Sequence, residues 1–167
     1  SLPPVSRFFL EPPARGDAEV EARLASANAE GPRVLHSGGE PGKRGGFSLY
    51  VPEYYTHERQ WPLVVALHGG SGDGFSFLWS WLPTARAIGA ILISPSSIDR
   101  TWPLAGEDSD TPNIAHIVES VRAQFSVDPT RLLLTGMSDG GTFCYVSGLE
   151  PESPFTHLAP VSAAFHP

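Results

Sequence analysis

Residues 132–143 read LLLTGMSDGGTF, and the interpretation of the whole chain starts from this stretch. An apolar run leads into the pentapeptide GMSDG at residues 136–140, and helix-compatible residues follow it. The pentapeptide matches G-x-S-x-G, a pattern typical of a sharp strand-to-helix turn that exposes a serine at its apex. Small neighbours let such a turn pack closely although the serine backbone is strained. The pattern therefore predicts a nucleophilic Ser138 between structural glycines, Gly136 and Gly140.

The predicted helix after Ser138 would add a second chemical element to this turn. Its N-terminus offers free backbone N–H groups and the positive end of the helix dipole. These groups suit the oxyanion that forms when a serine attacks an ester carbonyl. The alternative is a plain turn in which Ser138 only caps the helix. Because the motif lies between a buried strand and a helix, we favour the nucleophile.

Strands and helices alternate along the rest of the chain. Continuous apolar runs predict strands buried on both faces at residues 63–67, 90–97 and 131–138, and a fourth apolar strand at residues 157–165. An alternating pattern predicts a half-buried strand at residues 46–53. Helices are predicted at residues 74–90, with a kink at Pro83, at 111–125, with Thr111 as the N-cap, and at 140–150. This order predicts the α/β class, with a mostly parallel sheet covered by helices on both faces.

The first part of the chain differs in composition from the rest. Its start is Pro-rich and predicts an extended arm, and residues 17–31 predict a short helix between Asp17 and Gly31 as caps. Residues 37–46 are rich in glycine and predict a loop or a hairpin tip. We therefore predict an arm and a short helix over residues 1–45, and one α/β domain over residues 46–167.

Composition limits the class of protein. The 167 residues are 41% hydrophobic, which suits one domain with a real core. The net charge of −7 and the lack of a Lys/Arg run argue against a nucleic-acid partner. No apolar run approaches the roughly 20 residues of a membrane span. Cys144 is the single cysteine, which favours a reducing, cytoplasmic location, whereas a removed signal peptide is the alternative because the chain starts without Met.

A second motif, His68-Gly69-Gly70, follows the buried strand at residues 63–67. Together with G-x-S-x-G it resembles the α/β-hydrolase family, and most closely its polyhydroxybutyrate-depolymerase-like and phospholipase/carboxylesterase-like serine esterases, over roughly residues 46–165. The resemblance implies an oxyanion hole formed by the N–H groups of Gly70 and Asp139, with the Asp139 side chain pointing away. It also implies that His68 and Gly69 are structural, the His68 ring holding the loop by hydrogen bonds.

The stretch RTWPLAGEDSD at residues 100–110 also resembles this branch, in which a Trp near the substrate cleft is common. Trp102 either lines an acyl or alcohol pocket or packs as a loop aromatic, and the sequence favours neither. Four aromatic residues after the His-Gly-Gly motif either cover the site or, as we prefer, pack against the fold: Phe75, Phe77, Trp79 and Trp81.

Neither a metal nor a cofactor is predicted. The acidic residues Glu107, Asp108 and Asp110 are interpreted as a solvated loop, and the histidines show no metal-ligand spacing. His116 lies off the apolar stripe of its helix and is predicted to be exposed. The stretch GGSGDG departs from the dinucleotide and P-loop patterns, since Phe75 stands where the last glycine should be.

The general base and its acid are harder to place. The family orders its triad as Ser, acid, His, and beyond Ser138 the chain offers two histidines, His157 and His166. His157 starts the last predicted strand, at the end away from the site. His166 follows that strand at the site end, so it is the candidate to approach the pocket, although it comes early for the usual base. The family's last two strands would need roughly 50 to 70 further residues.

Three interpretations follow. We favour an esterase whose C-terminal strands are missing from this chain or supplied by a second chain, and which cleaves a small-molecule ester through an acyl-enzyme on Ser138. The second is an intact short protein with a non-standard base, such as His166 or a histidine of a partner. The third is a non-catalytic ligand-binding or interaction domain on a hydrolase scaffold. Esters, thioesters and lactones all suit the predicted site.

Overall fold

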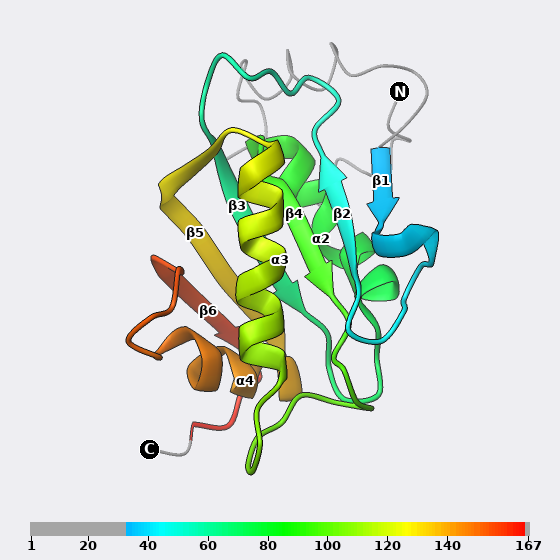
Figure 1. The fold of residues 1–167 in the computed structure, drawn as a ribbon, viewed down its shortest axis with the longest axis vertical. Coiled ribbons are helices and arrows are strands. Elements are labelled where there is room, and N and C mark those ends of the chain that lie inside the picture. Colours follow the sequence, from blue (N-terminus) through cyan, green and yellow to red (C-terminus); the bar gives the residue numbers. More distant parts are fainter. Residues whose placement is uncertain (1–32, 166–167) are drawn as a thin grey trace.

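The structure is a computed structural model that describes residues 33–165 of the chain. The predicted helix at residues 17–31, most of the predicted arm, and His166 lie outside the described residues. In the described part, six strands form one sheet in the order β1-β2-β4-β3-β5-β6 (Figure 1). Their bounds are β1 Arg33–His36, β2 Phe47–Val51, β3 Trp61–Leu67, β4 Ile91–Pro95, β5 Val127–Met137 and β6 His157–Val161.

Strands β3 to β6 form the parallel part of this sheet. β3 pairs in parallel with both β4 and β5, and β5 pairs in parallel with β6. β2 runs antiparallel to its two neighbours, β1 and β4. The predicted mostly parallel sheet is therefore confirmed. The glycine-rich residues 37–46 form the tip of the hairpin that joins β1 to β2, and His36 faces Ser48 at its base.

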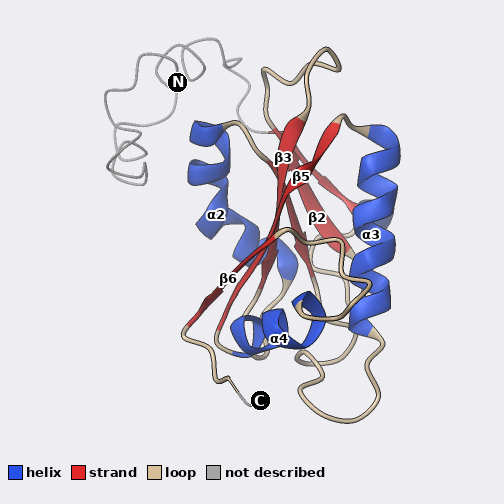
Figure 2. Ribbon diagram, turned by 90° about the vertical axis from the view of Figure 1, so that its left-hand side faces the viewer, coloured by secondary structure: helices blue, strands red, loops and turns tan. Residues whose placement is uncertain are grey.

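Helices cover both faces of the sheet, as predicted. The helices are α2 Gly74–Ile88, α3 Asp110–Gln124 and α4 Asp139–Gly148, with a short 3-10 helix at Ser37–Gly39. Figure 2 shows α2 on one face of the sheet and α3 and α4 on the other. No helix in the described part of the chain is long and apolar enough to cross a membrane.

The core consists of two apolar layers on either side of the sheet. Successive residues of β3 alternate between them: Leu63 and Val65 pack with α3 and α4, whereas Val64 packs with α2. All five residues from Leu63 to Leu67 are buried, as the continuous apolar run predicted. Burial on both faces is what a strand between two helical layers requires.

Two local predictions are wrong at their boundaries. Thr111 does not cap α3. The helix starts at Asp110, two residues before the start that a Thr111 cap implies, and the Asp108 carboxylate accepts hydrogen bonds from the N–H groups of Asp110 and Thr111. The strand predicted at residues 131–138 starts earlier, at Val127, because Val127 pairs with Trp61 at the start of β3. α2 continues through Pro83.

A buried ion pair links α2 to the segment after β2. Arg86 Nη2 lies 3.1 Å from Glu53 Oε1, and the two side chains are only 4% and 3% exposed. The hydroxyl of Tyr50 donates to the other carboxylate oxygen at 2.9 Å. Removing one partner of such a pair leaves the other charge buried without compensation.

We expect Glu53→Ala to lower the free energy of unfolding by about 3–5 kcal/mol, because Arg86 would stay buried and unpaired. Urea unfolding followed by circular dichroism measures this loss. The matched control is Glu119→Ala, which removes an exposed ion pair with Arg122 and should cost less than about 1 kcal/mol. Equal losses in the two variants would contradict a stabilising role for the buried pair.

Candidate active site

Ser138 lies at the junction between β5 and α4. Its backbone has φ 55° and ψ −118°, a conformation that a residue with a side chain rarely adopts. It is the N-cap residue of α4, yet its side chain makes no capping hydrogen bond. Its backbone N–H donates instead to Val161 O in β6 at 3.0 Å. The residue is exposed, so its hydroxyl is presented to solvent rather than used to cap the helix.

The glycines on either side of Ser138 are needed because backbones meet there. A Cβ atom added to Gly140 would lie 2.4 Å from His68 O, and one added to Gly136 would lie 2.5 Å from Gly140 O. Both distances are shorter than real side chains allow. The strand-to-helix turn over residues 136–140, called the elbow below, can therefore form only with glycine at these two positions.

The loop after β3, residues 68–72, lies directly against the elbow and is called the HGG loop below. A Cβ atom on Gly69 would lie 3.8 Å from Ser138 Cβ, and one on Gly70 would lie 2.5 Å from Asp139 Oδ2. Among the described residues, no acceptor bonds the backbone N–H of Gly70 or of Asp139. The N–H groups of Gly70 and Asp139, predicted from the sequence as oxyanion donors, thus lie on neighbouring segments beside Ser138. Neither donates a hydrogen bond within the described residues.

His68 is held by both of its ring nitrogens. Nδ1 lies 2.7 Å from Gly69 O, and Nε2 accepts from the N–H of Ser97 at 3.1 Å. Nδ1 is therefore the protonated nitrogen of a neutral ring. Burial lowers the pKa of this imidazole, which keeps it neutral. A histidine with both nitrogens occupied has no free site for a proton from Ser138.

Trp102 packs beneath the HGG loop. Its side chain is 1% exposed, and its Nε1–H donates to His68 O at 2.8 Å. Its ring stacks on Phe143 of α4, with centroids 5.4 Å apart, and also contacts the His68 ring. This placement favours packing over a direct contact with substrate. Two of the four aromatics of α2, Phe77 and Trp81, likewise pack against the core.

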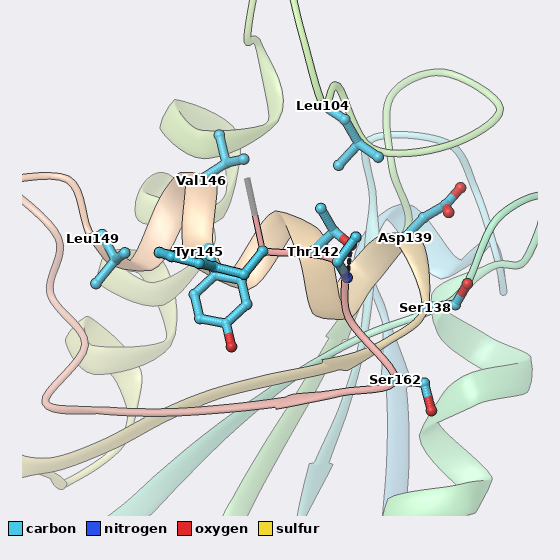
Figure 3. Close-up of a pocket in the computed structure, with 10 residues that line it drawn as sticks. Leu104, Ser138, Asp139, Thr142, Tyr145, Val146, Leu149 and Ser162 are labelled. Carbon is cyan, nitrogen blue, oxygen red and sulfur yellow. Dashed lines mark hydrogen bonds between the residues drawn. The ribbon is translucent and has the colours of Figure 1, made fainter. Parts of the chain in front are cut away.

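A pocket of about 540 Å³ opens beside Ser138 (Figure 3). Asp139 is one of the residues that line this pocket, and its carboxylate accepts a hydrogen bond at 2.7 Å from Thr101 Oγ1 in the loop between β4 and α3. The other lining residues are all apolar or carry a hydroxyl group: Leu104, Thr142, Tyr145, Val146, Leu149, Ser162, Ala164 and Phe165. The pocket is therefore largely apolar, with one carboxylate near the nucleophile.

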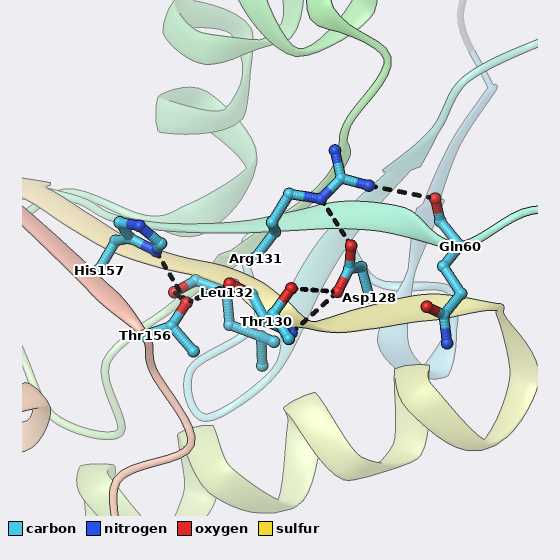
Figure 4. A network of polar contacts seen from close by, with 7 residues as sticks. All are labelled: Gln60, Asp128, Thr130, Arg131, Leu132, Thr156 and His157. Carbon is cyan, nitrogen blue, oxygen red and sulfur yellow. Dashed lines mark hydrogen bonds and ion pairs between the residues drawn. The ribbon is translucent and has the colours of Figure 1, made fainter.

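No described histidine is placed to act as a base for Ser138. His157 begins β6, the end of the strand opposite the elbow, and its Nδ1 lies 2.8 Å from Thr156 Oγ1 (Figure 4). His68 is occupied on both nitrogens. His166, the candidate from the sequence, lies outside the described residues. In the described part of the chain, no cluster of three or more His, Cys, Asp or Glu side chains could hold a metal ion.

The interpretation of the acidic residues as a solvated loop is wrong for Asp110. This residue starts α3 and is 2% exposed, and its Oδ1 accepts from the N–H of Ile98 at 2.9 Å. Burial raises its pKa to about 6, and the nearby carboxylates of Asp108 and Asp99 act in the same direction. Asp110 therefore closes the base of the loop between β4 and α3 rather than lying in solvent.

Comparison with solved structures identifies the architecture. The chain superimposes on the acetyl xylan esterase of Aspergillus awamori with a TM-score of 0.62, at 20% identity over 75% of this chain and 50% of that one. It superimposes on the poly(3-hydroxybutyrate) depolymerase LpqC of Bordetella parapertussis with a TM-score of 0.58, at 20% identity over 84% of this chain and 54% of that one. The chain has the α/β-hydrolase fold.

Sequence comparison points to esterases as relatives of this α/β-hydrolase chain. It is 29% identical over 123 residues to a probable feruloyl esterase C of Aspergillus terreus, covering 70% of this chain and 45% of that protein. It is 27% identical over 106 residues to a bifunctional acetylxylan esterase/xylanase of Neocallimastix patriciarum, covering 60% of this chain and 16% of that protein. No model of a known family matches the chain. The chain thus spans less than half of either protein.

Sequence reasoning missed two residues at the α/β-hydrolase site, Thr101 and Asp110. The Thr101 hydroxyl donates to Asp139 of the elbow, and the Asp110 carboxylate accepts from the N–H of Ile98 at the base of the loop that carries Thr101. Thr101 stands beside Trp102, but nothing in the stretch RTWP marks a threonine for a contact with residue 139. Asp110 stands one residue before the expected helix, which is a signal that could have placed it at the helix start.

We expect Gly140→Ala to destabilise the protein by about 1–3 kcal/mol, because its methyl group would meet backbone rather than a movable side chain. Gly69→Ala is the matched control in the neighbouring loop, since its Cβ would meet nothing closer than 3.5 Å. Thermal unfolding of the two variants measures the difference. A Gly140→Ala variant as stable as Gly69→Ala would show that the elbow does not need the close approach.

Asp110 should make stability depend on pH in a defined window. Its folded pKa of about 6 lies above the unfolded value of roughly 3.9, so the folded state binds more protons between these values. The stability that protonated Asp110 provides is therefore lost as pH rises from about 4 to about 6. Asp110→Asn keeps an acceptor for Ile98 and should be as stable as wild type at pH 4 and more stable at pH 7. Urea unfolding at both pH values tests this, and a difference independent of pH would contradict it.

Proposed function

We propose that this chain carries the nucleophile and the oxyanion hole of a serine hydrolase that cleaves carboxylic esters. The observation that carries the proposal is the exposed Ser138, whose side chain does not cap α4 and which adjoins two free N–H groups, those of Gly70 and Asp139. The similarity to proteins named as esterases supports the same class of reaction.

In the proposed reaction, Ser138 Oγ attacks the ester carbonyl while a base takes its proton. The carbonyl oxygen becomes an oxyanion that accepts hydrogen bonds from the N–H groups of Gly70 and Asp139. Collapse of this intermediate expels the alcohol, which takes up the proton, and leaves an acyl group on Ser138. Water then attacks the acyl-enzyme with the help of the same base, releasing the acid and the free serine.

The base and its acid are proposed to come from outside residues 33–165. His166 is one source, and a longer C-terminal segment or a second chain is the other. A serine without a base is a weak nucleophile, so the origin of the base determines the activity. The alternative is a non-catalytic binding domain, and the observation that favours it is the lack of a suitably placed histidine in the described part of the chain.

The pocket supports a neutral, partly apolar acyl or alcohol group as the substrate. Its described lining is apolar apart from hydroxyl groups and the carboxylate of Asp139, which would repel an anionic group near the nucleophile. The similar proteins are named for feruloyl and acetylxylan esters, which suggests an aromatic acyl or an acetyl ester. We propose location in the cytoplasm on the basis of the unpaired Cys144. We also propose that the α/β domain starts near residue 46.

Ser138→Ala should lower ester hydrolysis at least about a thousandfold without changing stability, because the nucleophile is lost and the exposed site keeps its packing. Hydrolysis of 4-nitrophenyl acetate and intact mass after treatment with a fluorophosphonate measure activity and the covalent adduct. Ser120→Ala, which removes a serine on α3 with its hydroxyl bonded to Ile117 O, is the control and should label like wild type. An adduct that persists in Ser138→Ala would refute the nucleophile, and no adduct in wild type would favour the binding domain.

A further inference from the structure

Three consecutive residues of the loop between β4 and α3 each hydrogen-bond a different part of the site. Arg100 Nε donates to Ser71 Oγ at 3.0 Å, and Trp102 Nε1 donates to His68 O at 2.8 Å, so both hold the HGG loop. Between them, Thr101 Oγ1 donates to Asp139 Oδ2 of the elbow at 2.7 Å. The same short segment therefore fastens the HGG loop and the elbow to each other.

The Asp139 carboxylate stands between Thr101 and Gly70. Its Oδ2 accepts from Thr101 and also lies so close to Gly70 that a Cβ there would be only 2.5 Å from it. Figure 3 shows the Asp139 side chain extending from the start of α4 towards the loop that carries Leu104. A carboxylate at this distance limits how closely Gly70 can approach Asp139, and these residues carry the two N–H groups of the proposed oxyanion hole.

The segment that carries Thr101 is itself firmly held. Trp102 is buried between the His68 and Phe143 rings, and Asp110 closes the base of the loop through the N–H of Ile98. A hydroxyl group fixed in this way can set the position of the carboxylate that it contacts. It also donates to a negative charge near the place where an oxyanion would form, which reduces the repulsion between the two.

We propose that Thr101 is a positioning residue for the oxyanion hole, acting through the Asp139 carboxylate to fix the spacing between the N–H groups of Gly70 and Asp139. This proposal rests on the proposed esterase function. It requires a hydroxyl group at position 101, so Thr101→Ser should preserve it and Thr101→Val, of nearly equal size, should abolish it.

The first test measures the geometry without using activity. The N–H of Gly72 donates to Gly69 O at 3.1 Å and closes the turn that contains Gly70, so its hydrogen exchange reports on the HGG loop. We expect exchange at Gly72, measured by NMR, to be about tenfold faster in Thr101→Val than in wild type. Thr101→Ser should exchange like wild type. An unchanged rate in Thr101→Val, or an equal rise in Thr101→Ser, would overturn the proposal.

The chain offers a matched control at the opposite end of β5. There Thr130 Oγ1 donates to Asp128 Oδ1, also at 2.7 Å (Figure 4). Both residues lie near the start of β5, whereas Ser138 follows its end. Thr130→Val removes the same kind of hydrogen bond and should leave exchange at Gly72 unchanged. Asp139→Ala removes the contact from its other side, and the double variant with Thr101→Val should exchange no faster than either single variant. Additive effects would overturn the proposed coupling.

A kinetic test separates this proposal from the proposed function. In assays of ester hydrolysis by this protein, Thr101→Val should lower kcat about tenfold and change KM less than about twofold. The reason is that the lost hydrogen bond stabilises the transition state more than the bound substrate. Thr101→Ser should restore kcat. Full activity in Ser138→Ala would refute Ser138 as the nucleophile, and the exchange rates would still decide the role of Thr101. Loss of activity in Ser138→Ala with unchanged kcat in Thr101→Val would refute only the positioning role.

Discussion

The close approach of α4 to the end of β3 is the constraint on which the rest of the site depends. At Gly140 the two backbones are so near that an added Cβ would lie 2.4 Å from His68 O. Because no side chain stands between them, the helix begins directly beside the HGG loop. Ser138 is the residue at the turn, and it takes the strained conformation that this contact imposes. The exposure of its hydroxyl follows from backbone packing.

The parallel sheet explains why segments distant in sequence meet at Ser138. β3 lies between β4 and β5, and all three run in the same direction, so their carboxyl ends lie at one edge of the sheet. The HGG loop follows β3, the loop with Trp102 follows β4, and the elbow follows β5. The HGG loop is therefore flanked on both sides. His68 bonds Ser97 on one side, and its main chain adjoins Gly140 on the other.

Features with a repeating or strictly local cause could be predicted from the sequence. The continuous apolar run at residues 63–67 predicted a strand buried on both faces, and the alternation of strands and helices predicted the fold class. The side-chain contacts of the site could not be predicted in this way, because they join loops of different strands. Thr101 meets Asp139 across 38 positions of the sequence, and Ile98 N–H meets the Asp110 carboxylate inside a loop that reads as polar and solvated. Such contacts depend on how the strands are ordered, which the motifs do not specify.

The same geometry restricts where a base for Ser138 can come from. β6 runs parallel to β5, so residues that precede β6 lie at the edge away from the elbow, and residues that follow it lie near the elbow. His157 precedes the strand and is excluded by position rather than by chemistry. The contacts described around the proposed oxyanion donors, Gly70 and Asp139, join the loops after β3 and β4 to the start of α4. In the proposed mechanism, Ser138 and the two donor N–H groups are therefore positioned without the base, and a histidine needs only to approach the elbow from a segment after a strand or from another chain.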